Sequence, residues 1–184
     1  METLYKNIHQ EIIDQCLQGN GKAQFQLYRL YHKTMYSVSL RILNNEAEAE
    51  DVMQEAFLSA FRKLDTYRGE VSFGAWLKKI VINRSLDYLK KKKIRFEEMD
   101  EKTNEISDLD TKYKEVNVEL IKKAIRELPD GYRVVLSLYL IEGYSHEEIS
   151  QILGISNSAS RTQYLRAKNK LRERLKDKEI FSYN

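Results

Sequence analysis

The sequence predicts an all-α protein in which two small helical domains are joined by a flexible acidic linker, with a helix-turn-helix in the second domain. Three observations predict this fold class. The 184 residues include a single proline, and the seven glycines fall mostly between segments whose apolar residues recur at helical spacing. Apolar residues form 42% of the chain, which permits real hydrophobic cores. The balance of charge changes sign along the chain, which indicates two basic units with an acidic segment between them.

Two helices are expected before residue 44. The first has apolar residues at helical spacing: Tyr5, Ile8, Ile12 and Cys16. It ends at Gly19-Asn20-Gly21, and a longer helix is expected from Phe25 to Leu43. The apolar side of that longer helix carries Tyr28, Tyr31, Met35, Val38 and Ile42. Cys16 is the only cysteine and is expected to be a small buried residue, so no internal disulfide can form.

The clearest helical pattern lies in residues 44–64. Its apolar residues fill the i, i+3, i+4, i+7 positions: Ala49, Val52, Met53, Ala56, Phe57, Ala60, Phe61 and Leu64. Five acids and no base occur from Glu46 to Glu55, and the helix dipole favours acids at an N-terminus. The dipole does not explain Leu58, a large apolar residue beside Asp51, Gln54 and Glu55 on the polar face. An acidic patch around an apolar contact favours docking on a basic protein surface.

A fourth helix is expected to begin near Ser72, after a loop that contains Tyr67 and Arg68. Its apolar residues are Phe73, Trp76, Leu77, Ile80, Val81 and Tyr88. The opposite face carries Lys79, Asn83, Asp87 and Lys90, followed by Lys91. Residues 78–95 hold eight lysines and arginines against one acid, a net charge of +7. Basic side chains with an amide, after an aromatic loop, suit binding of a nucleic-acid backbone with stacked bases. The alternatives are a core role for Trp76 and a solvated basic helix end.

The composition then inverts and predicts the domain boundaries. Residues 96–115 hold eight acids and three bases with weak periodicity, which is typical of a flexible linker. The first domain is therefore expected at residues 1–95 and the second at 116–184. The second begins with a helix whose apolar residues are Leu120, Ile121, Ala124, Ile125 and Leu128. A further helix follows Pro129 and runs to Gly143, with Tyr132, Val135, Leu138 and Tyr139 facing inward.

Residues 143–175 predict a helix, a tight turn and a second helix. Ser145 and Glu148 form a capping box, and Gly154 stands where a left-handed residue ends a helix. Ser156 can cap the next helix, expected from Asn157 to Leu175. Its inward face carries Tyr164, Ala167, Leu171 and Leu175, and its outward face carries Arg161, Thr162, Leu165, Arg166, Lys168 and Arg172. Such a basic second helix is typical of a DNA-reading helix-turn-helix, and a helical hairpin with a solvated charged face is the alternative.

Several classes of function find no support in the sequence. His9, His32 and His146 are far apart and have no metal-ligand spacing, so no metal or cofactor is expected. The carboxylates near Asp51 have no nucleophile or metal cluster nearby, and no enzymatic activity is predicted. No signal peptide or apolar run of membrane length appears, which predicts a cytoplasmic protein without membrane insertion. The formal charge of +3 decides nothing by itself.

Taken together, these motifs resemble an extracytoplasmic-function (ECF) sigma factor, one of the small specificity subunits of bacterial RNA polymerase. The resemblance runs from about Ala23 to Leu175. Three stretches carry it: AEDVMQEAFLSAF, YRGEVSFGAWLKKIVINRSLDYL and LPDGYRVVLSLYLIEGYSHEEISQILGIS. It implies core RNA polymerase, with its β and β′ subunits, and promoter DNA as partners, and it implies an anti-sigma factor as a regulator.

The resemblance also assigns roles to residues. The β′ coiled coil is expected on Asp51, Gln54, Glu55 and Leu58 of the third helix. The −10 promoter element, with a flipped base, is expected on Tyr67, Arg68, Lys79, Asn83, Asp87, Lys90 and Lys91. The −35 element is expected on Ser158, Arg161, Thr162, Leu165, Arg166 and Lys170 of the last helix. The acidic linker resembles a segment that threads the RNA-exit path of the polymerase.

Two features depart from the family pattern. The last helix opens with the polar run Asn157-Ser158-Ala159-Ser160, and Gln163 stands where a basic residue is common. Because of both departures, the resemblance does not define the −35 sequence that this chain recognises. The competing interpretation is a stand-alone helix-turn-helix regulator that never contacts polymerase. Such a regulator has no need of the acidic face around Asp51 and Leu58, and this difference separates the two hypotheses.

Overall fold

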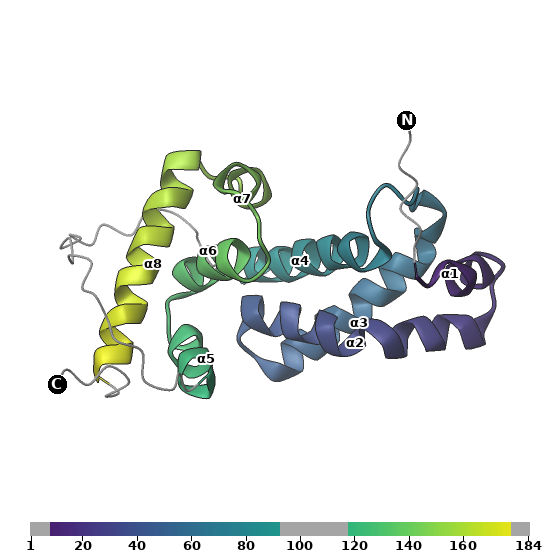
Figure 1. Ribbon diagram of the computed structural model, residues 1–184, viewed down its shortest axis with the longest axis horizontal. Helices are drawn as coiled ribbons and strands as arrows, with labels where there is room; N and C mark the ends of the chain where they lie inside the picture. Colours follow the sequence, from purple (N-terminus) through teal and green to yellow (C-terminus); the bar gives the residue numbers. More distant parts are fainter. Residues whose placement is uncertain (1–7, 93–117, 178–184) are drawn as a thin grey trace. The chain divides into compact units, whose positions relative to one another are not determined.

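The computed structural model describes residues 8–92 and 118–177, and within these ranges every regular element is a helix. The described residues form two compact units, one on each side of the gap (Figure 1). The all-α prediction is confirmed. The linker expected at residues 96–115 lies outside the described residues, as does Tyr5 of the first expected helix.

The first unit is built from four α-helices and one short 3-10 helix (Figure 1). Their bounds are α1 (Gln10–Leu17), α2 (Gly21–Leu43), α3 (Glu46–Arg62), the 3-10 helix η1 (Leu64–Thr66) and α4 (Phe73–Lys91). The helices α2, α3 and α4 pack against one another in all three pairs, and α1 packs on α2. The eight apolar positions predicted for the third helix supply much of this core. Seven of them are buried, and Phe61 is half-buried.

Capping side chains set the helix boundaries in this unit. The Asn20 side chain accepts hydrogen bonds from the Lys22 and Ala23 amides, so α2 begins at Gly21, four residues before the predicted start. Asn44 ends α2 in the left-handed conformation with φ 56°, and Asn45 caps α3 through the Glu48 amide. Ser72 caps α4 through the Ala75 amide, at the predicted position.

The first helix differs from its prediction. Ile8 lies before α1 and is 93% exposed, whereas Ile13, which the expected pattern did not include, is 1% exposed. Because α1 has only eight residues, its buried side consists of Ile13 and Cys16. The burial predicted for Cys16 is confirmed, and that burial raises the pKa of its thiol.

The second unit contains α5 (Val118–Arg126), α6 (Asp130–Leu140), α7 (His146–Leu153) and α8 (Asn157–Asp177). The long helix α8 packs against each of the other three. The core at its centre consists of Leu128, Tyr132, Leu136 and Ala167, with Ile125, Tyr164 and Leu171 packed around them. Helix α6 ends at Leu140, three residues before Gly143, and Tyr139 is 36% exposed rather than buried.

Arg133 is the largest fully buried side chain of the second unit and was not predicted. Its guanidinium donates to the Leu128 carbonyl oxygen at 3.1 Å and pairs with the Asp130 carboxylate. Both partners flank Pro129, where α5 gives way to α6. A buried charge needs such partners, so Arg133 ties the start of α6 to the preceding turn.

Candidate functional site

The acidic face of α3 is exposed in the first unit. Asp51, Gln54 and Glu55 are exposed, and Leu58 keeps 56% of its surface open to solvent. These four residues lie on the side of α3 opposite its buried apolar positions, because their spacing places them on one helical face. An exposed leucine among carboxylates is an apolar contact surrounded by charge, and this arrangement suits a partner with a basic surface.

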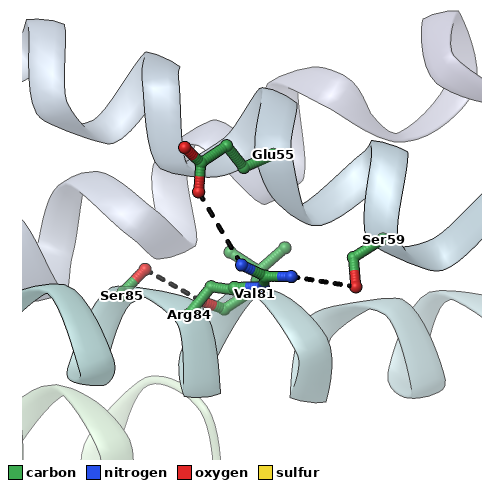
Figure 2. Close-up of polar contacts among 5 residues, drawn as sticks. All are labelled: Glu55, Ser59, Val81, Arg84 and Ser85. Carbon is green, nitrogen blue, oxygen red and sulfur yellow. Dashed lines mark hydrogen bonds and ion pairs between the residues drawn. The ribbon is translucent and has the colours of Figure 1, made fainter.

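Two of the acids on α3 are paired with cations of α4. The Arg84 guanidinium lies 3.8 Å from the Glu55 carboxylate and donates a 3.2 Å hydrogen bond to Ser59 Oγ (Figure 2). Lys92, at the end of α4, pairs with Glu48. Asp51 lies between these two acids and makes no hydrogen bond or ion pair within the described part of the chain. The carboxylate of Asp51 is therefore open to an external cation.

The basic face of α4 is also exposed. Five predicted DNA-binding side chains of this helix point into solvent: Lys79, Asn83, Asp87, Lys90 and Lys91. The opposite side of α4 is held by a buried contact between Ser85 Oγ and Ser39 Oγ of α2 at 3.1 Å. Ser85 also donates to the Val81 carbonyl oxygen at 2.8 Å (Figure 2). The Ser85–Ser39 contact turns this side of α4 toward α2, and the basic side therefore faces outward.

Aromatic rings gather where the loop at residues 67–72 enters α4. The ring of Tyr67 lies 5.6 Å from that of Phe73 and 5.3 Å from that of Trp76. Tyr67 also donates a hydrogen bond to the Val71 carbonyl oxygen at 2.7 Å, which closes the loop. Phe73 is fully buried, whereas Tyr67 and Trp76 are half-buried. The core role expected for Trp76 is met in part, because the residue keeps some of its surface exposed.

In the second unit, α7 and α8 form the predicted helix-turn-helix. The Ser145 hydroxyl accepts from the Glu148 amide at 3.2 Å while the Glu148 carboxylate accepts from the Ser145 amide at 2.8 Å, so the capping box is present. Gly154 ends α7 with φ 69°, and Ser156 caps α8 through the Ala159 amide. These local signals were all predicted from the sequence.

The outward face of α8 contains the predicted −35 side chains. Ser158, Arg161 and Leu165 are exposed. Thr162, Arg166 and Lys170 are half-buried. Gln163 behaves differently, because only 3% of it is exposed. The side chain of Gln163 therefore faces the interior of the unit, and the expectation that this departure affects the −35 sequence stays a prediction.

A histidine that sequence reasoning set aside lies at the joint between α7 and α8. The His146 ring stacks on Tyr139 at 4.4 Å and meets Tyr164 edge-on, and its Nδ1 lies 2.9 Å from Ser160 Oγ. Burial, with a smaller contribution from Arg161, lowers the pKa of His146. The neutral imidazole therefore holds the start of α7 against α6 and α8. This role depends on contacts between helices, so the sequence alone does not reveal it.

Two other features, a metal-binding cluster and a membrane-spanning helix, are absent from the described ranges. Residues 8–92 and 118–177 contain no group of three or more His, Cys, Asp or Glu side chains that could hold a metal ion. None of the helices in those ranges is long and apolar enough to cross a membrane.

Comparison with known proteins identifies the class to which these two units belong. Residues 27–94 match the family model for Sigma-70 region 2, and residues 119–171 match the model for Sigma-70, region 4. The first match covers α3, α4 and most of α2, and the second covers nearly all of α5 together with α6, α7 and much of α8.

The full chain has relatives of similar length. It is 32% identical over 180 residues to the ECF RNA polymerase sigma factor SigW of Bacillus subtilis, covering 90% of this chain and 95% of SigW. It is 27% identical to the ECF RNA polymerase sigma-E factor of Escherichia coli, with 86% and 90% of the two chains covered. The chain belongs to the family of ECF RNA polymerase sigma factors. This family consists of transcription initiation factors, and this chain is a sigma factor that directs transcription initiation.

Solved structures support the same fold. The sigma factor RpoE of Bartonella quintana, crystallised with the anti-sigma factor NepR, matches with a TM-score of 0.56 at 24% identity, over 82% of this chain and 95% of that one. CnrH, solved with the cytosolic domain of CnrY, matches with a TM-score of 0.52 at 23% identity, over 90% and 96% of the two chains.

Proposed function

We propose that this sigma factor binds core RNA polymerase through α3 and reads a bipartite promoter through α4 and α8. The observation that carries the proposal is the presence of three separate exposed faces on two units, one acidic with an apolar centre and two basic. A stand-alone operator-binding protein has no use for the acidic face. The proposed divisions are residues 1–95 for polymerase binding and −10 recognition, 96–115 for a linker and 116–184 for −35 recognition.

The polymerase contact is proposed on Asp51, Gln54, Glu55 and Leu58. Leu58 supplies the apolar contact, and the unpaired carboxylate of Asp51 supplies a charge to a basic surface of the β′ subunit. Removal of an acid at the centre of such a patch costs more than removal of one at its rim, since the central group is fully desolvated in the complex.

The −10 contact is proposed on the loop and on the outward face of α4. Lys79, Lys90 and Lys91 attract the phosphate backbone, and Asn83 is the exposed amide that can hydrogen-bond a base edge. Tyr67 and Trp76 offer a ring surface on which an unpaired base can stack. Base stacking on protein rings compensates for part of the stacking that is lost when the duplex melts.

The −35 contact is proposed on α8, with its N-terminal half in the major groove. Arg161 donates through Nε to the Asn157 side chain at 2.8 Å, which aligns its guanidinium along the exposed edge of the helix. Arg166 lies about one and a half turns further along α8, and Lys170 about two and a half turns further. Arginine is the side chain that most often donates two hydrogen bonds to guanine, and Arg166 is therefore the proposed base contact.

Three further assignments follow from the proposal. The chain acts in the cytoplasm, where it meets the polymerase, and an anti-sigma factor holds it inactive. The bound partners of the RpoE and CnrH structures support a regulator of this kind. The chain itself performs no chemical step, because the polymerase carries out phosphoryl transfer and the sigma factor contributes binding free energy to the open complex.

Run-off transcription with purified bacterial core RNA polymerase tests the proposal. Genomic fragments from the source organism serve as templates, with and without the protein. We expect discrete transcripts that depend on the protein. Absence of transcripts, together with sequence-specific DNA binding by the protein alone, would instead support a stand-alone regulator.

A further inference from the structure

Arg84 stands between the two proposed binding faces of the first unit and was not singled out by the sequence. It follows Asn83 directly in α4, so its Cβ is turned by about 100° from the DNA-facing side. The Arg84 guanidinium reaches across to α3, where it contacts Glu55 and Ser59 (Figure 2). Glu55 belongs to the proposed polymerase face. Arg84 therefore contacts a residue of the proposed polymerase face, whereas Asn83, its neighbour in sequence, belongs to the proposed −10 face.

The two contacts of Arg84 differ in kind. Ser59 is only 7% exposed, so its hydrogen bond with Arg84 is shielded from water. The Glu55 side chain is 66% exposed, and its carboxylate lies 3.8 Å from the guanidinium of Arg84, whose side chain is 45% exposed. An ion pair this open is weak and readily exchanges one partner for another. The Ser59 contact is therefore suited to persist in a complex, whereas the Glu55 contact is suited to be replaced.

The surrounding contacts show why the position of Arg84 matters for DNA reading. The next residue, Ser85, is buried and contacts Ser39 of α2 at 3.1 Å. Arg84 and Ser85 together connect α4 to both of its neighbours through polar groups. Apolar packing alone tolerates small rotations of a helix, whereas hydrogen bonds require a particular direction. Rotation of α4 would move Asn83 and Lys90 away from their outward positions.

We propose that Arg84 is a positioning residue that couples polymerase binding on α3 to promoter reading on α4. The Ser59 bond fixes the rotation of α4, and the polymerase competes with Arg84 for Glu55. When the polymerase takes the Glu55 carboxylate, the guanidinium loses a neutralising partner beside the DNA face, and α4 becomes more attractive to phosphate. Coupling of two sites through a shared group is reciprocal, so bound DNA also favours polymerase binding. This inference rests on the proposed function of both faces.

The test compares two readouts on the same variants. The first is the affinity of fluorescently labelled protein for core RNA polymerase, and the second is open-complex formation on a promoter recovered by run-off transcription. For Arg84→Ala we expect core affinity equal to wild type or up to about fivefold tighter, because Glu55 has lost its competitor. We expect open-complex formation to fall about tenfold, because the charged hydrogen bond to Ser59 is lost. Arg84→Lys, which keeps the charge, should recover part of the loss.

Two controls separate the inference from its alternatives. Lys33→Ala removes one exposed positive charge from α2 and should leave both readouts unchanged. In a Glu55→Gln background, Arg84→Ala should no longer tighten core binding, since the competition no longer exists. Circular dichroism of each variant checks that its helical content equals that of wild type.

The remaining outcomes overturn the inference. Equal losses of core affinity and of opening in Arg84→Ala would mean that Arg84 only holds the fold together. Unchanged opening would mean that α4 does not depend on it. If the wild-type protein neither binds core polymerase nor supports transcription, the proposed function fails, and the inference fails with it. The wild-type measurements alone reveal that result.

Discussion

The first unit presents its candidate binding residues on two neighbouring helices, whereas the second presents its DNA-reading residues on one. In the first unit, α3 and α4 are joined across their polar edges by the Arg84 contacts and by the Lys92–Glu48 pair. In the second unit, features close in sequence set the direction in which α8 begins: the capping box of α7, the left-handed Gly154 and the Ser156 cap. Contacts distant in sequence therefore connect the two proposed binding faces of the first unit, whereas contacts close in sequence set the start of a single helix in the second.

The difference between the units also explains what could be predicted from the sequence. The helix-turn-helix is encoded within a dozen residues, so Ser145, Glu148 and Gly154 predict it without knowledge of the fold. The apolar pattern of α3 likewise predicts its buried side and, by exclusion, the exposed Asp51 and Leu58. Periodicity of this kind depends only on helix geometry, which tertiary packing leaves unchanged.

Features that depend on contact between elements were missed or wrong. Nothing within α4 marks Arg84 as the partner of Glu55, since the two lie on different helices far apart in the sequence. Gln163 was noted only as a departure from the family pattern, and the sequence did not reveal that it lies buried where α8 packs against the other helices. Tyr139 was expected to be buried, yet the end of α6 leaves it exposed beside His146. Each error concerns a residue whose environment is set by a neighbouring helix.

The largest effect is expected from a substitution that disrupts only the proposed polymerase face of the first unit. Asp51→Arg places a positive charge where the proposed partner is also positive, and we expect association with core polymerase to be abolished with helical content intact. Co-purification with core enzyme measures the effect. Glu11→Arg makes the same charge change on the exposed side of α1 and serves as the control. Wild-type levels of co-purification for Asp51→Arg would remove α3 from the polymerase interface.

A smaller effect is expected when the DNA face of the second unit is altered. Arg166→Ala should cost about 1–3 kcal/mol of promoter binding and relax specificity at one position of the −35 element. Binding of holoenzyme to a set of promoter variants measures both. Lys176→Ala, near the far end of α8, should change affinity little and specificity not at all. A response to promoter variants identical to that of wild type would exclude Arg166 as a base contact.

The turn of the second unit can be weakened without touching the first. Gly154 has φ 69°, and a Cβ added there would meet no other atom within 4 Å. Gly154→Ala therefore causes no clash but places an L-residue in the left-handed region. We expect a loss of about 1–2 kcal/mol of stability. The only tryptophan, Trp76, lies in the first unit, so its fluorescence reports that unit and circular dichroism reports both. We expect the two units to unfold separately, so the fluorescence transition should stay in place while a circular dichroism transition moves to lower temperature. Movement of both transitions would contradict this expectation.

The smallest expected effect is a pH dependence confined to the second unit. Because burial lowers the pKa of His146 in the folded state, the unfolded state binds a proton more readily. The contribution of His146 to the free energy of unfolding is therefore complete above the unfolded pKa of about 6.5, and it declines as the pH falls below that value. Thermal unfolding between pH 7.5 and 5 measures the slope, and His146→Gln should flatten it for the second unit. A slope unchanged by this substitution would assign the pH dependence to another group.

The most direct test of the central claim, that two units read two promoter elements in one initiation complex, is run-off transcription on every single-base variant of one promoter. Wild-type protein should show two separate blocks of sensitive positions. Arg166→Ala should alter the response only in the upstream block, and Asn83→Ala only in the downstream block. A single continuous block, or the same altered positions for both variants, would contradict the account.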